Sequence, residues 1–117
     1  MNNMLLDMGT INKMACSPDY KARFASEYLL LKNRYDKLKA MCDKYECGLK
    51  CGDVTKFLGF VPDCPLELLR EQQRAMGMYI GALDKRCLFE KIDVWQIYDY
   101  CLPVVTRNED DEDWDMK

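Results

Sequence analysis

Histidine is absent from the sequence, and this absence removes several classes of active site. Without an imidazole the chain has no Ser-His or Cys-His nucleophile pair. It also lacks the glycine-rich loop followed by Lys-Ser or Lys-Thr that holds nucleotide phosphates. We therefore expect a binding protein and not an enzyme, with no catalytic residues and no cofactor.

Long apolar runs are absent as well. No stretch approaches the roughly 20 apolar residues that a membrane-spanning helix needs, and the first residues lack the basic start and apolar run of an export signal. The odd number of cysteines, seven, favours free thiols in a reducing compartment. We expect a cytoplasmic protein without a membrane partner.

The cysteines do not follow the spacing of a metal site. Cys42, Cys47 and Cys51 are separated by four and three residues, which is not a zinc-knuckle spacing, and Cys42 falls on the apolar face of a predicted helix. Since no histidine can complete the set, we expect no bound metal.

Strong net charge is missing from most of the chain. The formal charge is −3, and the last eleven residues, 107–117, contain six acids and two bases. The rest is nearly neutral and lacks the basic stripe typical of a duplex DNA binder. We expect a single helical domain at 1–106, an acidic disordered tail at 107–117, and no direct binding of duplex DNA.

Apolar periodicity is what the sequence does contain. From Tyr20 to Tyr45, apolar residues recur at spacings of three and four after a helix start at Ser17, Pro18 and Asp19. This pattern predicts a long helix over about 18–46 that ends near Gly48. The residues before it, 1–17, show little pattern.

Two further helices follow. Pro62 and Pro65 bracket a second start, and the apolar seam beyond them predicts a long helix over about 64–90. Asp93 is placed to cap a short third helix over about 93–102. The connection at 47–63 is expected to be a loop, so the fold class is all-α: an antiparallel helical hairpin with a short third helix.

The faces of these two helices are wider than one partner helix covers. On the second helix, apolar residues lie beside the main seam: Leu68, Ala75, Tyr79 and Ala82. Symmetric self-association is the usual way to bury such surface, so we expect a homo-oligomer.

Gly77 and Gly81 interrupt the second helix, although each costs about 1 kcal/mol relative to alanine. In one interpretation the glycines let another helix approach closely, and Arg70, Arg74 and Lys85 belong to a solvated rim. In the other, the bare backbone is the floor of an anion site. Arg70, Arg74 and Lys85 then bind phosphate, and Tyr28 or Tyr35 stacks on a base.

The segments "DYKARFASEYLLLKNRYDKLKAMCDKYE" and "DCPLELLREQQRAMGMYIGALDKR", residues 19–46 and 63–86, resemble a family of small helical-hairpin proteins carried by tailed phages and prophages of gut bacteria, including crAss-like phages. The helix–loop–helix layout is also similar to phage sponges for cyclic nucleotide signals in anti-CBASS and anti-Thoeris defence. These resemblances imply a phage accessory protein that acts in the cytoplasm of a bacterial host.

Three functions remain open at this point. The first is a counter-defence protein: an oligomeric helical hairpin that sequesters a phosphorylated nucleotide immune messenger, such as a cyclic nucleotide or another small anionic ligand. The second is a protein–protein inhibitor of a host defence complex, similar to an anti-CRISPR, with the acidic tail as nucleic-acid mimic. The third is a structural or regulatory phage component.

Overall fold

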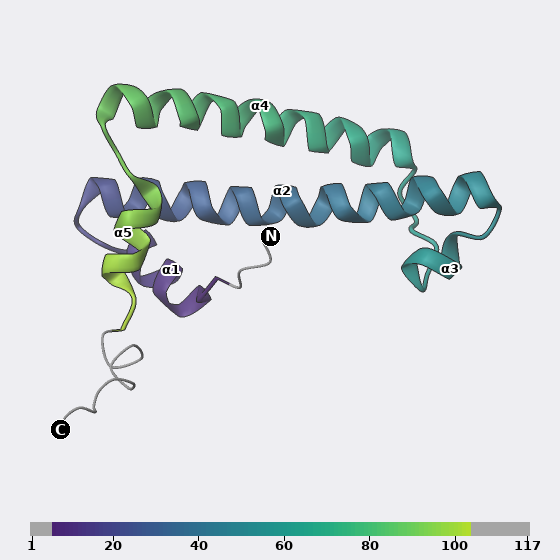
Figure 1. The fold of residues 1–117 in the computed structure, drawn as a ribbon, viewed down its shortest axis with the longest axis horizontal. Coiled ribbons are helices and arrows are strands. Elements are labelled where there is room, and N and C mark those ends of the chain that lie inside the picture. The colour runs from purple at the N-terminus through teal and green to yellow at the C-terminus, as the bar shows by residue number, and fades with distance from the viewer. Residues whose placement is uncertain (1–5, 104–117) are drawn as a thin grey trace. The chain divides into compact units, whose positions relative to one another are not determined.

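The structure is a computed structural model that describes residues 6–103. The acidic tail expected at 107–117 lies outside the described residues. Within them the chain forms five helices and no strand, which confirms the all-α class (Figure 1). None of these helices is both long enough and apolar enough to cross a bilayer.

The helices are α1 (Met8–Ala15), α2 (Tyr20–Cys51), α3 (Val54–Leu58), α4 (Leu66–Glu90) and α5 (Val94–Cys101). The chain divides into two compact units. Unit 1 comprises Met1–Leu29 with Glu90–Lys117, and unit 2 comprises Leu30–Phe89. Each unit has its own packing and is described separately.

Unit 1 is built around α1, the start of α2, and α5. Ile11 and Met14 of α1 and Leu29 of α2 are each 1% exposed and form its best-buried apolar residues together with Ala25. The backbone N–H of Asp7 donates a hydrogen bond to the Tyr98 hydroxyl at 2.8 Å. This bond ties the start of α1 to α5.

α1 falls in the segment where the sequence showed little pattern. Asp7, the residue that precedes α1, makes no side-chain hydrogen bond to the helix backbone, so the usual capping interaction at a helix start is missing. α5 carries the start signal that α1 lacks, because the Asp93 side chain accepts from the backbone N–H of Gln96 at 3.1 Å. The predicted cap of the third helix is thus confirmed.

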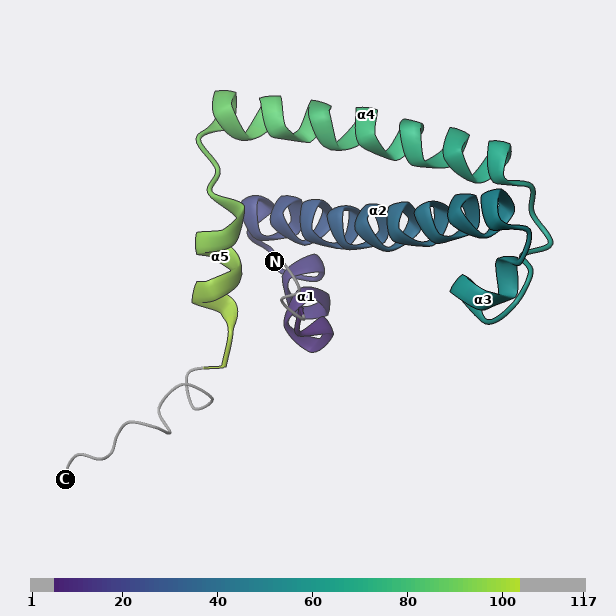
Figure 2. The same cartoon turned by 45° about the vertical axis from the view of Figure 1, so that its right-hand side comes forward.

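Unit 2 is a helical hairpin. α4 runs back beside the C-terminal part of α2, with α3 at the turn (Figures 1 and 2). Cys42 and Leu83 are buried on the two facing helices, with exposures of 0% and 2%. Burial of Cys42 raises the pKa of its thiol, so it stays protonated and unreactive.

Gly48 does not end α2, contrary to the expectation from the sequence. The helix continues through it to Cys51, and α3 then occupies part of the expected loop. A β-carbon on Gly48 would lie 2.5 Å from the Cα of Val54. The glycine is therefore a point of close approach, where the backbone of α3 packs directly on α2.

Candidate functional site

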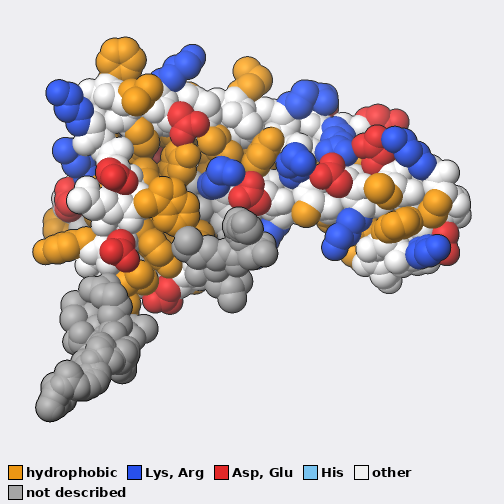
Figure 3. Space-filling model, viewed as in Figure 1, with side chains coloured by type: hydrophobic (Ala, Val, Ile, Leu, Met, Phe, Trp, Pro, Cys, Tyr) orange, Lys and Arg blue, Asp and Glu red, His pale blue; other side chains and the backbone are white. Residues whose placement is uncertain are grey.

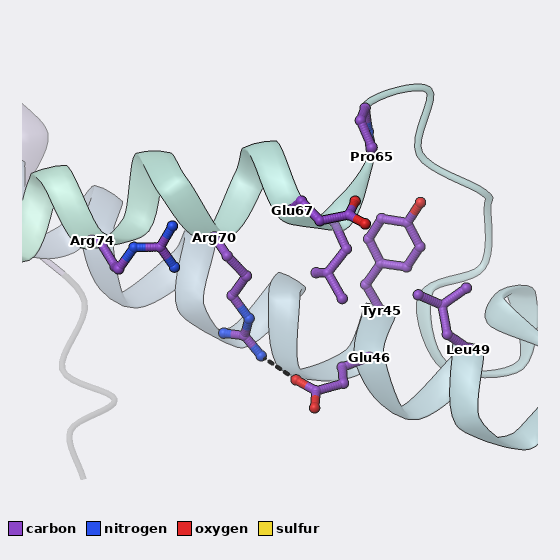
Figure 4. Close-up of a pocket in the computed structure, with 8 residues that line it drawn as sticks. Tyr45, Glu46, Leu49, Pro65, Glu67, Arg70 and Arg74 are labelled. Atoms are coloured by element: carbon purple, nitrogen blue, oxygen red, sulfur yellow. Dashed lines mark hydrogen bonds and ion pairs between the residues drawn. The ribbon is translucent and has the colours of Figure 1, made fainter.

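Unit 2 contains an open groove between the last turns of α2 and the first turns of α4 (Figure 4). Its volume is about 620 Å³, which is in the range of small-molecule sites. The residues that line it are Tyr45, Glu46, Leu49, Pro65, Leu66, Glu67, Arg70 and Arg74. The walls thus combine apolar side chains with two cations and two carboxylates.

Arg70 joins the two helices of the hairpin across this groove. Its Nη2 lies 2.7 Å from Glu46 Oε1 and 3.0 Å from Asp43 Oδ1, and its Nη1 donates to Gln73 Oε1 at 2.7 Å. These three partners use most of the donors of the guanidinium. Arg70 is therefore engaged inside the protein, and we call this arrangement the Arg70 clamp.

The clamp shifts the titration of its members. Hydrogen bonds from Lys39 and then Arg70 lower the pKa of Asp43 below 3.8. Hydrogen bonds from Arg70 and then Lys50 lower the pKa of Glu46 below 4.5. The hydrogen bond to Glu46 raises the pKa of Arg70. All three groups are thus charged at neutral pH.

Because of the Arg70 clamp, we expect part of the free energy of unfolding to depend on pH in the acid range. Because the pKa values of both carboxyls are lowered in the folded state, their contribution is present above about pH 4.5 and is lost as the pH falls through the lowered values. Arg70→Gln should lower the urea midpoint at pH 7 and have much less effect near pH 3. Arg34→Gln, an exposed position on α2, is the control. An Arg70→Gln effect independent of pH would contradict the clamp.

Arg74 lies one turn further along α4 and also lines the groove (Figure 4). It is exposed, and within residues 6–103 it has no ion-pair partner. Gly81 and Lys85 follow on the same face of α4, since at 100° per residue all three lie within about 40° of one another. Lys85 is likewise exposed and has no ion-pair partner among the described residues.

The two glycines have different surroundings. A β-carbon on Gly77 would lie 3.4 Å from Cε1 of Tyr35 on α2, so the ring of Tyr35 fills that position. A β-carbon on Gly81 would meet nothing within 4 Å. Gly77 therefore accommodates the neighbouring helix, whereas the backbone at Gly81 is uncovered. We call the set Arg74, Gly81 and Lys85 the Gly81 notch.

Of the seven residues that the sequence singled out, four belong to these features: Arg70, Arg74, Gly81 and Lys85. Tyr35 packs on Gly77, with the Lys32 ammonium 5.9 Å from its ring centre. Tyr28 is half-buried and belongs to unit 1.

The acidic partners of Arg70 and the groove residues on α2 were not singled out from the sequence. Asp43 and Glu46 carried a usable signal, because an antiparallel hairpin places the last turns of the first helix opposite the first turns of the second. Acids there and an arginine at position 70 are complementary. Tyr45 was identified only as a residue of the apolar seam.

No group of three or more metal-ligating side chains is found in the described part of the chain. No curated protein and no solved structure matches the chain. A family model described as Sequestin matches residues 18–88, a segment that contains the whole of α2 and α3 and nearly all of α4. The name fits a role in sequestering a ligand, which is binding and not catalysis. Because the matched segment is more than half of the 117 residues, the chain belongs to the Sequestin family.

Proposed function

We propose that this protein is a phage counter-defence protein that sequesters a phosphorylated nucleotide, an immune messenger of the bacterial host. Membership of the Sequestin family supports the sequestering part of the proposal. The resemblance to phage-borne hairpin proteins supports the phage context. The nucleotide is proposed from the chemistry of unit 2.

The observation that carries the proposal is the Gly81 notch. Two cations without ion-pair partners in the described chain, Arg74 and Lys85, lie on either side of a helix backbone that no side chain covers. Arg74 lies about 10 Å before Gly81 and Lys85 about 6 Å after it along the helix axis. A phosphate placed over Gly81 approaches the backbone closely and lies between two donors that suit it.

The groove supplies room for the rest of a nucleotide. Arg74 belongs to both features, so a ligand with its phosphate at the notch can extend past Arg74 into the groove. Leu49, Pro65 and Leu66 offer apolar contact to a base, and the Glu67 carboxylate can accept hydrogen bonds from ribose hydroxyls or base amino groups. Tyr35 packs on Gly77, one turn before Gly81, whereas Arg70 holds the hairpin together.

Thermal unfolding with a panel of cyclic dinucleotides and cyclic ADP-ribose variants tests the proposal. A ligand present at 100 times its dissociation constant should add about 2.7 kcal/mol to the free energy of unfolding and raise the Tm. The same panel with the Arg74→Glu variant is the control for the site. A wild-type Tm that no member of the panel changes would contradict the proposal.

A further inference from the structure

A second feature of α4 is an apolar stripe on a side of the helix that its buried residues do not occupy. Leu68, Ala75, Ala82 and Phe89 follow one another at intervals of seven, and Met78 and Tyr79 lie between the two alanines. The larger side chains are 53% (Leu68), 77% (Met78), 45% (Tyr79) and 88% (Phe89) exposed. Hydrophobic side chains project between Lys and Arg where α4 runs in the space-filling view (Figure 3).

The interval of seven is the repeat of two helices packed along their length. At 100° per residue, Ile80 and Leu83, the buried residues of α4, lie about 90–150° from the centre of the stripe. The hairpin therefore uses one face of α4 and leaves the stripe to another partner. Charged residues, among them Glu71 and Lys85, lie between these side chains, and exposed apolar side chains gathered on one side of a helix are typical of an interaction site.

The order of side chains along the stripe is nearly the same when read from either end. Large residues stand at both ends (Leu68 and Phe89), alanines stand inside them (Ala75 and Ala82), and Met78 and Tyr79 occupy the middle. When two such helices pack antiparallel about a two-fold axis near the middle, large side chains meet large ones and alanines meet alanines. The small pairs let the helices approach closely. This order favours a second copy of the same chain as the partner.

The charges beside the stripe favour the same orientation. Glu71 lies near its start, and Lys85 and Arg86 lie near its end, at almost equal distances from the middle. An antiparallel pair brings Glu71 of each copy close to Lys85 and Arg86 of the other. The two-fold axis repeats this attraction between opposite charges at both ends of the stripe. A parallel pair would place Glu71 against Glu71 and Lys85 against Lys85, which is unfavourable.

We propose that two copies of this chain form a dimer through the apolar stripe, with their α4 helices antiparallel. The dimer forms without ligand, and failure of ligand binding leaves it intact. Lys85 belongs both to the Gly81 notch and to the charges beside the stripe, so variants at Lys85 are judged here by the mass of the protein and not by ligand binding.

Light scattering across a concentration series tests the interface. The wild-type protein should have twice the 13.8 kDa mass of the chain, and Met78→Glu should weaken the dimer at least about tenfold. Leu88→Glu is the matched control, because Leu88 is also 77% exposed on α4 but lies off the stripe. A monomeric wild type at every concentration, or equal effects of the two variants, would overturn the proposal.

Charge exchange tests the orientation. Glu71→Lys and Lys85→Glu should each weaken an antiparallel dimer, and the double variant should restore it, because opposite charges meet again. In a parallel dimer position 71 faces position 71 and position 85 faces position 85, so like charges still meet in all three variants. Single variants that dimerise as well as the wild type would therefore refute the antiparallel arrangement.

Discussion

Replacement of Arg74 by glutamate is expected to raise the dissociation constant for a phosphorylated nucleotide at least about a hundredfold. The substitution removes a charge-assisted hydrogen bond, worth about 1.5–3 kcal/mol, and every 1.4 kcal/mol is tenfold in affinity. It also places a carboxylate beside the phosphate. Arg74 carries this effect because it is the one residue shared by the groove and the Gly81 notch. Calorimetric titration measures the change.

Arg34→Glu is the matched control for this prediction. Arg34 is an exposed arginine on α2 outside both features, so the variant has the same net charge as Arg74→Glu. It should bind the ligand nearly as tightly as the wild type does. If the two variants lost affinity equally, binding would depend on the net charge of the protein and not on the proposed site.

Replacement of Gly48 by alanine is expected to destabilise the protein by about 1–3 kcal/mol, the usual cost of overpacking. The new β-carbon would lie 2.5 Å from the backbone Cα of Val54, which cannot yield as a flexible side chain does. α3 must then move away from α2. Chemical denaturation of the variant measures the loss.

Gly81→Ala is the matched substitution, and it is expected to raise the free energy of unfolding where Gly48→Ala lowers it. A β-carbon there meets nothing within 4 Å, so alanine should stabilise the helix by up to about 1 kcal/mol through its higher propensity. The same methyl group should weaken nucleotide binding, because it covers the floor of the notch. A variant that gains stability and keeps full affinity would show that the ligand does not use Gly81.

The long helices were predictable because their apolar residues repeat with the period of a helix. Phe24, Cys42 and Tyr45 of the predicted seam are buried. Ala25 and Leu29 of the same helix are also among the best-buried residues. Both belong to unit 1, where α1 and α5 add to the packing. A pattern on one helix does not reveal how many neighbours cover it.

The groove and α1 were harder to predict for different reasons. α1 is only eight residues long and lacks a side-chain cap, so it depends on tertiary packing of Ile11 and Met14. Gly48 was interpreted as the end of the helix because glycine is common after helix ends. Close approach of two backbones also requires glycine, so the residue alone does not distinguish the two cases. For Arg70 the sequence left open a phosphate ligand and a residue of a solvated rim, because its carboxylate partners become neighbours only once the hairpin is formed.

Recovery of the ligand from its complex tests the central claim most directly. The protein is incubated with the nucleotide that raises its Tm most, freed of unbound ligand, and denatured, and the released molecule is identified by chromatography and mass spectrometry. Sequestration predicts that the nucleotide is retained and released chemically unchanged. A converted product, or no retained nucleotide, would contradict the account.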